Sequence, residues 1–208
     1  MQDPTYNSDA RTLVVIAHPG LSGASRVHKR WVAELSKHPD EFVIHDLYTA
    51  IPQEQHGLVT LDDATVEAER ELLTKHERIV YQFPVYWYSC PALLRTWMDS
   101  VYGFGWAYGG EQAQPGEPGR MLAGKRFACA VSAGDIKANY CAEGTVGFTM
   151  DEVLTPFRAC ASYVGAVCDP HAFAVYGTEN GNLSDERLEA VTADYLNWLR
   201  ALQLSDLG

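Results

Sequence analysis

The sequence predicts an α/β fold: a doubly wound sheet of five parallel strands, in the order 2-1-3-4-5, with helices on both faces. Five short apolar segments alternate with segments of helical periodicity. Strands without a polar face are typical of parallel sheets that are covered on both sides. The 208 residues contain no internal repeat and no linker, which favours one domain at 11–208 after a flexible N-terminal lead at 1–10.

The strands are predicted from short apolar runs that end at turn residues. The first run, TLVVIA, is apolar at every position after Thr12, as expected of a strand buried on both faces. The third run ends at Pro84, which cannot donate to a further ladder hydrogen bond. The predicted strands are 12–17, 41–47, 78–84, 126–132 and 171–177.

The segments between the strands carry apolar residues at helical spacing. In one of them Leu93, Trp97 and Val101 share a face, and Pro91 stands in the first turn, where proline is tolerated. Ser184 begins the last helix as its cap. The predicted helices span 25–37, 65–75, 91–101, 148–161 and 184 to the C-terminus, and the predicted loops are 47–61, 102–124 and 133–147.

Composition narrows the range of partners. The net charge is −11, and such a surface repels the phosphates of nucleic acids and of anionic membranes. No apolar run is long enough to span a bilayer, so membrane insertion is not expected. The five cysteines form no C-x-x-C pair, which favours reduced thiols and a cytoplasmic protein. The histidines lack metal-ligand spacing, so no metal site is predicted.

Ligands of doubly wound sheets bind beyond the carboxyl ends of the strands, where strands 1 and 3 separate. HPGLSGASR, at 18–26, follows the first strand there and precedes a helix. The candidate donors to phosphate oxygens are His18, Ser22, Ser25 and Arg26, and a helix N-terminus attracts anions. The same loop also fits a plain Gly/Ser turn in which Ser25 caps the helix.

Two further loops share this edge of the predicted sheet. PVYWYSCP follows the third strand with three aromatic residues in a row, which can lie along a flat ligand or can pack in the core. SAGDIKANY follows the fourth strand, and its small residues permit a close approach of the backbone. Together the loops describe a site for a phosphorylated flat heterocycle such as FMN. A nicotinamide dinucleotide fits less well, because G-x-G-x-x-G is missing.

A family resemblance adds to this interpretation. FPVYWYSCPALLRTWMDSVYGFGWAYG, at 83–109, resembles the signature of flavodoxin-like NAD(P)H:quinone oxidoreductases. That family includes the mammalian quinone reductases and the ancillary oxidoreductases of glutathione-gated potassium efflux systems. AHPGLSGASRVHKR resembles the phosphate loop of the family, and the resemblance extends from Thr12 to about Leu202.

The resemblance implies a cofactor site built from three loops. The residues that would hold the flavin phosphate are His18, Ser25, Arg26 and Val27. The residues that would line one side of the isoalloxazine are Pro84, Val85, Tyr86, Trp87 and Tyr88. The residues that would line the other side are Ser132, Ala133, Gly134 and Asp135. Tyr140 matches a tyrosine near the hydride path and is the implied catalytic residue.

The implied function is a two-electron reductase. NAD(P)H would reduce bound FMN, or FAD, and a quinone or similar flat acceptor would take the hydride in a ping-pong cycle in one pocket. The alternatives are a regulatory subunit of a potassium efflux channel, a flavodoxin-type electron carrier and a reductase of one specific metabolite. The family also implies a homodimer. Three departures stand out. The loop between His18 and Ser25 is one residue longer than the family pattern, His28 replaces a common asparagine, and AEGTVGF (142–148) offers no counterpart of the active-site histidine.

Overall fold

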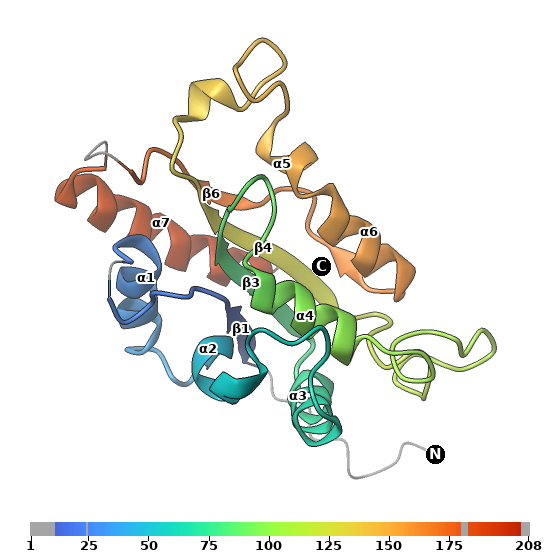
Figure 1. The fold of residues 1–208 in the computed structure, drawn as a ribbon. Coiled ribbons are helices and arrows are strands. Elements are labelled where there is room, and N and C mark those ends of the chain that lie inside the picture. Colours follow the sequence, from blue (N-terminus) through green and yellow to red (C-terminus); the bar gives the residue numbers. More distant parts are fainter. Residues whose placement is uncertain (1–10, 24, 180–182, 205–208) are drawn as a thin grey trace.

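The computed structural model describes residues 11–23, 25–179 and 183–204, so the predicted lead at 1–10 lies outside the described residues. A parallel sheet forms the centre of the molecule (Figure 1). Its strand order is β2-β1-β3-β4-β5, with β6 also paired to β4. The predicted α/β class and the order 2-1-3-4-5 are therefore confirmed.

The fifth position of the sheet is split between two short strands, so the sheet has six strands rather than the predicted five. The backbone N–H of Asp169 still donates to the carbonyl of Phe127, at 2.8 Å, but Pro170 has no N–H to continue the pairing. Pairing with β4 resumes at Phe173. The strands are β1 Thr12–Ile16, β2 Phe42–Asp46, β3 Arg78–Pro84, β4 Arg126–Ser132, β5 Val167–Cys168 and β6 Phe173–Val175.

Two predicted segments differ in their helices. The helix predicted at 148–161 is interrupted at Leu154, because Pro156 cannot donate to the preceding turn. The loop predicted at 47–61 begins with a short helix, whose N-terminus is capped by the Asp46 carboxylate. The helices are α1 Val27–Leu35, α2 Leu47–Ala50, α3 Asp63–Lys75, α4 Ala92–Val101, α5 Met150–Val153, α6 Thr155–Tyr163 and α7 Asp185–Leu204.

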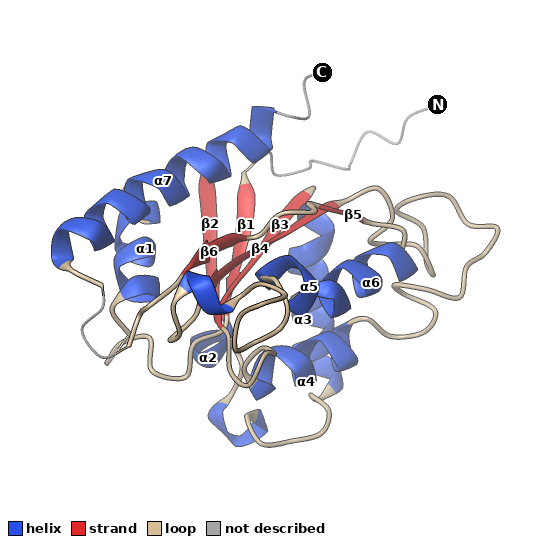
Figure 2. Ribbon diagram, turned by 90° about the horizontal axis from the view of Figure 1, so that it is seen from above, coloured by secondary structure: helices blue, strands red, loops and turns tan. Residues whose placement is uncertain are grey.

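Successive residues of the central strands point to opposite faces of the sheet, and each face has its own core. Val14 and Ile16 pack beneath α1 and α7, whereas Leu13 and Val15 pack against α3, α4 and α6. Figure 2 shows the helices on both sides of the sheet. The alternation explains why β1 has no polar face.

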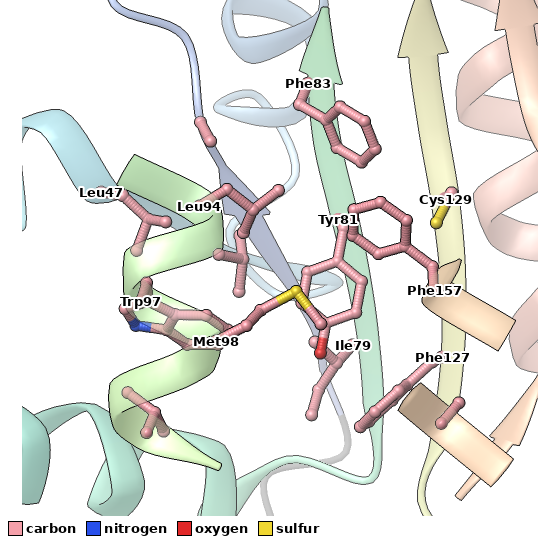
Figure 3. Packing of buried hydrophobic residues seen from close by; sticks show 14 of the residues in the cluster. Leu47, Ile79, Tyr81, Phe83, Leu94, Trp97, Met98, Phe127, Cys129 and Phe157 are labelled. Carbon is pink, nitrogen blue, oxygen red and sulfur yellow. The ribbon is translucent and has the colours of Figure 1, made fainter. Parts of the chain in front are cut away.

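The core on the α4 side is rich in aromatic side chains (Figure 3). Tyr81 of β3 lies edge-on to Phe127, with ring centroids 5.5 Å apart, and Phe83 stacks on Phe157 at 5.0 Å. Pairs of this kind contribute about 0.5–1.5 kcal/mol beyond the area they bury. They hold β3 and β4 rigidly below the loops that follow these strands.

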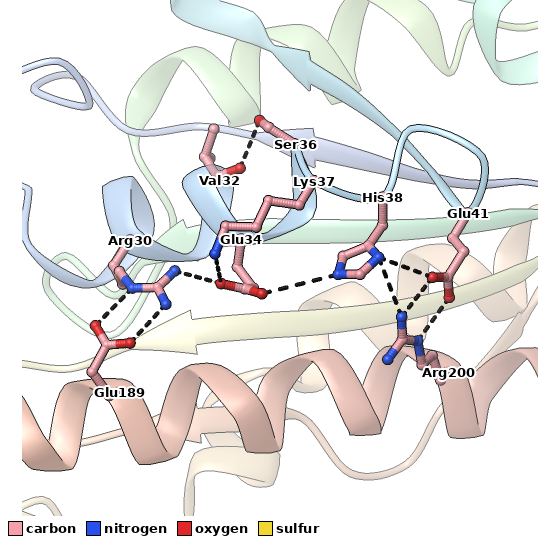
Figure 4. A network of polar contacts seen from close by, with 9 residues as sticks. All are labelled: Arg30, Val32, Glu34, Ser36, Lys37, His38, Glu41, Glu189 and Arg200. Carbon is pink, nitrogen blue, oxygen red and sulfur yellow. Dashed lines mark hydrogen bonds and ion pairs between the residues drawn. The ribbon is translucent and has the colours of Figure 1, made fainter.

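On the opposite face, ion pairs join α1 and its following turn to α7 (Figure 4). Arg30 donates to both oxygens of Glu189 at 2.7 Å and to Glu34 at 2.8 Å. Arg200 donates to both oxygens of Glu41, at 2.6 and 2.7 Å. We call these five residues the polar seam. Such two-pronged arginine pairs fix the position of α7 across α1.

Candidate functional site

The loops after β1, β3 and β4 meet at one edge of the sheet. Main-chain hydrogen bonds extend the ladder one residue past each strand. Ala17 donates to Gln82 at 3.0 Å, Val85 donates to Ser132 at 2.8 Å, and Ala133 donates to Val175 at 2.8 Å. The carboxyl ends of parallel strands thus bring together the three loops that the sequence singled out.

The loop after β1 turns sharply before α1. His18 accepts a hydrogen bond on Nδ1 from the backbone N–H of Gly20 at 3.0 Å, and partial burial lowers the pKa of its imidazole. Ser25 is only 7 % exposed, and its Oγ has no hydrogen-bond partner among the described residues. The N-cap of α1 is Arg26, without a side-chain hydrogen bond, so Ser25 does not cap the helix. A buried hydroxyl without a partner is costly and is rare in proteins.

Arg26 points its side chain away from this loop. Its guanidinium donates to the carbonyl of Leu183 at 2.8 Å and to the carboxylate of Asp185 at 2.6 Å, at the start of α7. The backbone N–H groups of Arg26 and Val27 remain at the N-terminus of α1, which has no acidic residue in its first turn. The loop therefore presents main-chain donors and the Ser25 hydroxyl rather than this cation.

His28 links the first loop to the end of β4. Its imidazole is completely buried, and burial, reinforced by nearby His18, lowers its pKa to about 3. Nε2 is 2.8 Å from the Ser132 hydroxyl, whereas Nδ1 has no partner among the described residues. His28 is therefore neutral at physiological pH and joins two loops of the site across 104 positions of sequence.

The aromatic residues after β3 form a tight turn and not a core patch. Tyr86 and Ser89 exchange two backbone hydrogen bonds, at 2.9 and 3.0 Å. The two residues between them, Trp87 and Tyr88, have φ angles of +47° and +60°, a conformation that favours glycine. Trp87 is 94 % exposed. Strain of about 1–3 kcal/mol per residue at such a turn is typical of binding sites.

The loop after β4 is held by its own carboxylate. Asp135 accepts hydrogen bonds from the backbone N–H of Ile136 at 2.7 Å and from the Asn139 amide at 2.8 Å. Ala133 is buried at the start of this loop. Its carbonyl accepts from the backbone N–H and the hydroxyl of Thr178, both at 3.2 Å. The chain after β6 is thereby fastened to the loop after β4.

Tyr140 lies beside Tyr176 and interacts electrostatically with Tyr88 of the aromatic turn. Its ring lies 5.2 Å from that of Tyr176, and burial raises the pKa of its phenol, with smaller contributions from Tyr88 and Asp135. The interaction with Tyr88 places Tyr140 close to the loop after β3. A phenol of this kind remains protonated at neutral pH and can donate a hydrogen bond.

Sequence reasoning missed the segment after β6, which contributes Tyr176, Thr178 and Glu179 to this edge. The signal was present, because β6 is parallel to β4 and its carboxyl end lies at the same edge as those of β1, β3 and β4. The rule that selected three loops applied equally to this fourth one.

A separate cavity of about 500 Å³ lies on the other flank of the loop after β1. It is lined by His18, Ser22, Lys29, Asp46, Tyr48 and His56, among others. Within the described residues no group of three acidic, histidine or cysteine side chains could hold a metal ion. No described helix is long and apolar enough to cross a membrane. All five cysteines are free, as predicted.

Comparison with known proteins agrees with this architecture. The model of a family described by its flavodoxin-like fold matches residues 10–199. The uncharacterized NAD(P)H oxidoreductase YrkL of Bacillus subtilis is 39 % identical over 191 residues, covering 92 % of this chain and 98 % of that protein. The glutathione-regulated potassium-efflux system ancillary protein KefG of Cronobacter sakazakii is 32 % identical over 195 residues, covering 91 % and 92 %.

Solved structures show the same likeness. General stress protein 14 of Treponema denticola, solved in complex with FMN, is 39 % identical, with a TM-score of 0.78 over 92 % of this chain and 99 % of that one. An NADPH-quinone reductase from P. pentosaceus is 27 % identical, with a TM-score of 0.71 over 91 % and 97 %. The chain therefore belongs to the family with the flavodoxin-like fold, in which it is similar to NAD(P)H oxidoreductases and to potassium-efflux ancillary proteins.

Proposed function

We propose that this protein binds FMN at the carboxyl edge of its sheet and transfers two electrons from NAD(P)H to a quinone or a similar flat acceptor. FMN is bound in a structure that is 39 % identical to this chain, and similar proteins are named NAD(P)H oxidoreductase and NADPH-quinone reductase. The proposal assigns these properties to this chain on the features of its own site.

One observation carries the proposal: a buried serine hydroxyl without a partner stands at an uncapped helix N-terminus. Ser25 Oγ and the first N–H groups of α1, at Arg26 and Val27, are donors in need of an acceptor. One phosphate could accept hydrogen bonds from all of these donors. The imidazole of His18 lies near the same helix start, with its ring centroid 5.2 Å from that of His28. The residues present therefore fit the phosphate end of FMN, and the guanidinium of Arg26 is not needed for it.

The loops after β3 and β4 fit the flat end of FMN. Pro84 and Val85 lead into the turn at Tyr86–Tyr88, which exposes aromatic faces. Ser132 to Asp135 supply the facing backbone at the next strand. Aromatic and backbone walls of this kind bind flat heterocycles and exclude bulky ones.

Bound FMN would supply the chemistry, taking a hydride from NAD(P)H and passing it with a solvent proton to a quinone, so that NAD(P)H, H⁺ and quinone become NAD(P)⁺ and quinol. The protein positions the reactants and controls protons. We assign Tyr140 the catalytic role of donating a hydrogen bond to the acceptor oxygen, since its pKa is raised and its phenol stays protonated.

The test begins with the spectrum of the purified protein, with FMN, FAD or neither added. An oxidised-flavin band that is bleached without oxygen by NADPH or NADH, and restored by a quinone, supports the reductase. Ser25→Ala should weaken FMN binding roughly ten- to hundredfold, as expected for a hydrogen bond to a charged group. Ser22→Ala, in the same loop but exposed, is the matched control.

Two results would contradict the proposal. If the protein bound neither FMN nor FAD, the site would not be a flavin site. If flavin bound but neither nicotinamide reduced it, the second candidate would gain: a flavoprotein subunit of a potassium efflux channel. That candidate is favoured by the similarity to KefG over 91 % of the chain. Binding of the purified protein to a channel's cytoplasmic domain would test it directly.

A homodimer in the cytoplasm is part of the same proposal. Phe104 and Tyr163 are exposed aromatic side chains, and with Tyr108 they line a common hollow of about 530 Å³ beside α6. Exposed apolar surface of this kind is typical of an interface between protein chains. Sedimentation of the protein and of a Tyr163→Asp variant would show whether this surface holds two copies together.

A further inference from the structure

The segment after β6 is fastened across the loop after β4. Gly177 donates its N–H to the carbonyl of Asp135 at 2.8 Å. Thr178 donates its N–H and its hydroxyl to the carbonyl of Ala133, both at 3.2 Å. Three hydrogen bonds within two residues fix the backbone that carries the next side chain, Glu179.

The carboxyl group of Glu179 lies directly over Gly134. A Cβ atom placed on Gly134 would come within 2.6 Å of the carboxyl carbon and 2.8 Å of Oε1, so a larger residue there would displace the carboxylate. The charge of Glu179 also reaches Tyr86, whose pKa is raised first by burial and then by this carboxylate. Glu179 therefore lies between the loop after β3 and the loop after β4.

This carboxylate has no partner among the described residues, in contrast to its neighbour. Asp135 is held by the N–H of Ile136 and the amide of Asn139. Arg26, the cation that the sequence placed at the site, is paired with Asp185 instead. Among the described residues no salt bridge neutralises the charge of Glu179, which is exposed beside Gly134 and Tyr86.

We propose that Glu179 determines the charge class of the acceptor: its carboxylate repels anionic flat molecules, so neutral or cationic ones are the preferred substrates. The inference rests on the function proposed above, because it takes the space between Tyr86 and Gly134 as the flavin and acceptor site. Discrimination by an uncompensated like charge is a common route to specificity. The repulsion is long-ranged at the rim of a site and is screened by salt.

The experiment compares a neutral quinone, menadione, with an anionic one, anthraquinone-2-sulfonate, on the FMN-loaded protein. The ratio of their kcat/KM values should fall roughly fivefold in Glu179→Gln and should fall further in Glu179→Lys. Glu71→Gln removes an exposed carboxylate from α3 and is the matched control, with an expected ratio equal to that of the native protein. Raising the salt concentration should reduce the preference for menadione over anthraquinone-2-sulfonate only in the proteins that keep Glu179, which are the native protein and Glu71→Gln.

A second readout does not depend on turnover. A negative charge beside the flavin disfavours the added charge of its reduced form, so Glu179→Gln should bind reduced FMN more tightly relative to oxidised FMN. A tenfold change in that ratio raises the midpoint potential by about 30 mV for a two-electron couple. A reductive titration of each holoprotein measures it, with Glu71→Gln again as the control.

The outcomes separate this inference from the function on which it rests. If the native protein fails to bind FMN, both are overturned. If it binds FMN and reduces quinones, but the preference for menadione and the potential are unchanged in Glu179→Gln and Glu179→Lys, only the role of Glu179 is overturned. If the preference for menadione falls equally in Glu71→Gln, it arises from the overall charge of −11 and not from Glu179.

Discussion

The side of α1 that faces α7 and the N-terminal end of α1 differ in whether their polar side chains have hydrogen-bond partners. Along the flank, Arg30 has a carboxylate partner on α7 and another on α1 itself. At the beginning, the described buried side-chain atoms without a hydrogen bond belong to Ser25, His28 and Trp31, joined by Gln82 of neighbouring β3. Part of the polar seam thus lies on α1, the helix that also carries the unsatisfied groups of His28 and Trp31.

The difference separates stability from function. Buried polar atoms are nearly always paired in native proteins, and each exception calls for an explanation. The seam contributes to folding without reference to any ligand. The unpaired groups around Ser25 lower stability, and under the function proposed above the phosphate of FMN would be the acceptor for the Ser25 hydroxyl.

The largest effect should come from His28 in acid. Its folded-state pKa of about 3 lies below the ordinary 6.5, so between these values the unfolded chain takes up a proton that the folded protein excludes. The free energy of unfolding should therefore fall by about 1.4 kcal/mol for each pH unit below 6.5. Urea unfolding of the native protein and of His28→Asn, from pH 7 to 5, measures the difference.

The free energy of unfolding of His28→Asn should depend less on pH over this range. His171→Asn, which replaces an exposed histidine, is the matched control. Equal slopes for the native protein and His28→Asn would mean that the buried imidazole does not oppose protonation. The imidazole of His28 would then no longer count among the unsatisfied buried groups at the beginning of α1.

A smaller gain is expected from relaxing the aromatic turn. Tyr88 has a φ of +60°, and replacing it by glycine removes the steric cost of that conformation. Tyr88→Gly should raise the free energy of unfolding by about 1 kcal/mol and should weaken flavin binding. Phe148→Gly, at an exposed aromatic position without a positive φ, should lower stability instead. A loss of stability in both variants would show that the turn is unstrained.

The smallest effect belongs to the polar seam. Arg200 holds the pKa of Glu41 below its ordinary 4.5, so the pair stabilises the fold above that pH and loses its contribution as the pH falls further. Both side chains are partly exposed, which limits the contribution to about 0.2–1 kcal/mol. Arg200→Gln should cost this amount at pH 7 and progressively less as the pH falls below 4.5. Arg187→Gln, on the same helix, is the control.

The fold could be predicted because hydrophobic runs and turn residues report burial directly. The strand order followed from five apolar runs alternating with helices, and the structure confirms it. Two of the errors fall where a proline acts against an apolar pattern. Pro170 divides the last strand, and Pro156 interrupts the helix predicted at 148–161. The spacing of apolar residues does not reveal that one residue, a proline, lacks a backbone N–H.

The site was predicted less completely, for a different reason. The rule about carboxyl ends predicted that three loops share one edge of the sheet, and they do, with His18 and Ser25 both in the loop after β1. Side-chain direction follows from partners distant in sequence, which no local pattern contains. Arg26 turns to Asp185, and His28 reaches Ser132, over 159 and 104 positions. Glu179 was missed because only the first, third and fourth strands were followed to their ends.

The placement of α7 has a consequence for the order of folding. The face of the sheet that carries Val14 and Ile16 is closed by Tyr195 and Leu199, near the end of the chain. During synthesis this face stays open to water until α7, which follows all six strands of the sheet, has left the ribosome. The α4 face can close earlier, since α3, α4 and α6 all precede α7. The core on the α4 face can therefore be buried before the core on the other face, which needs α7.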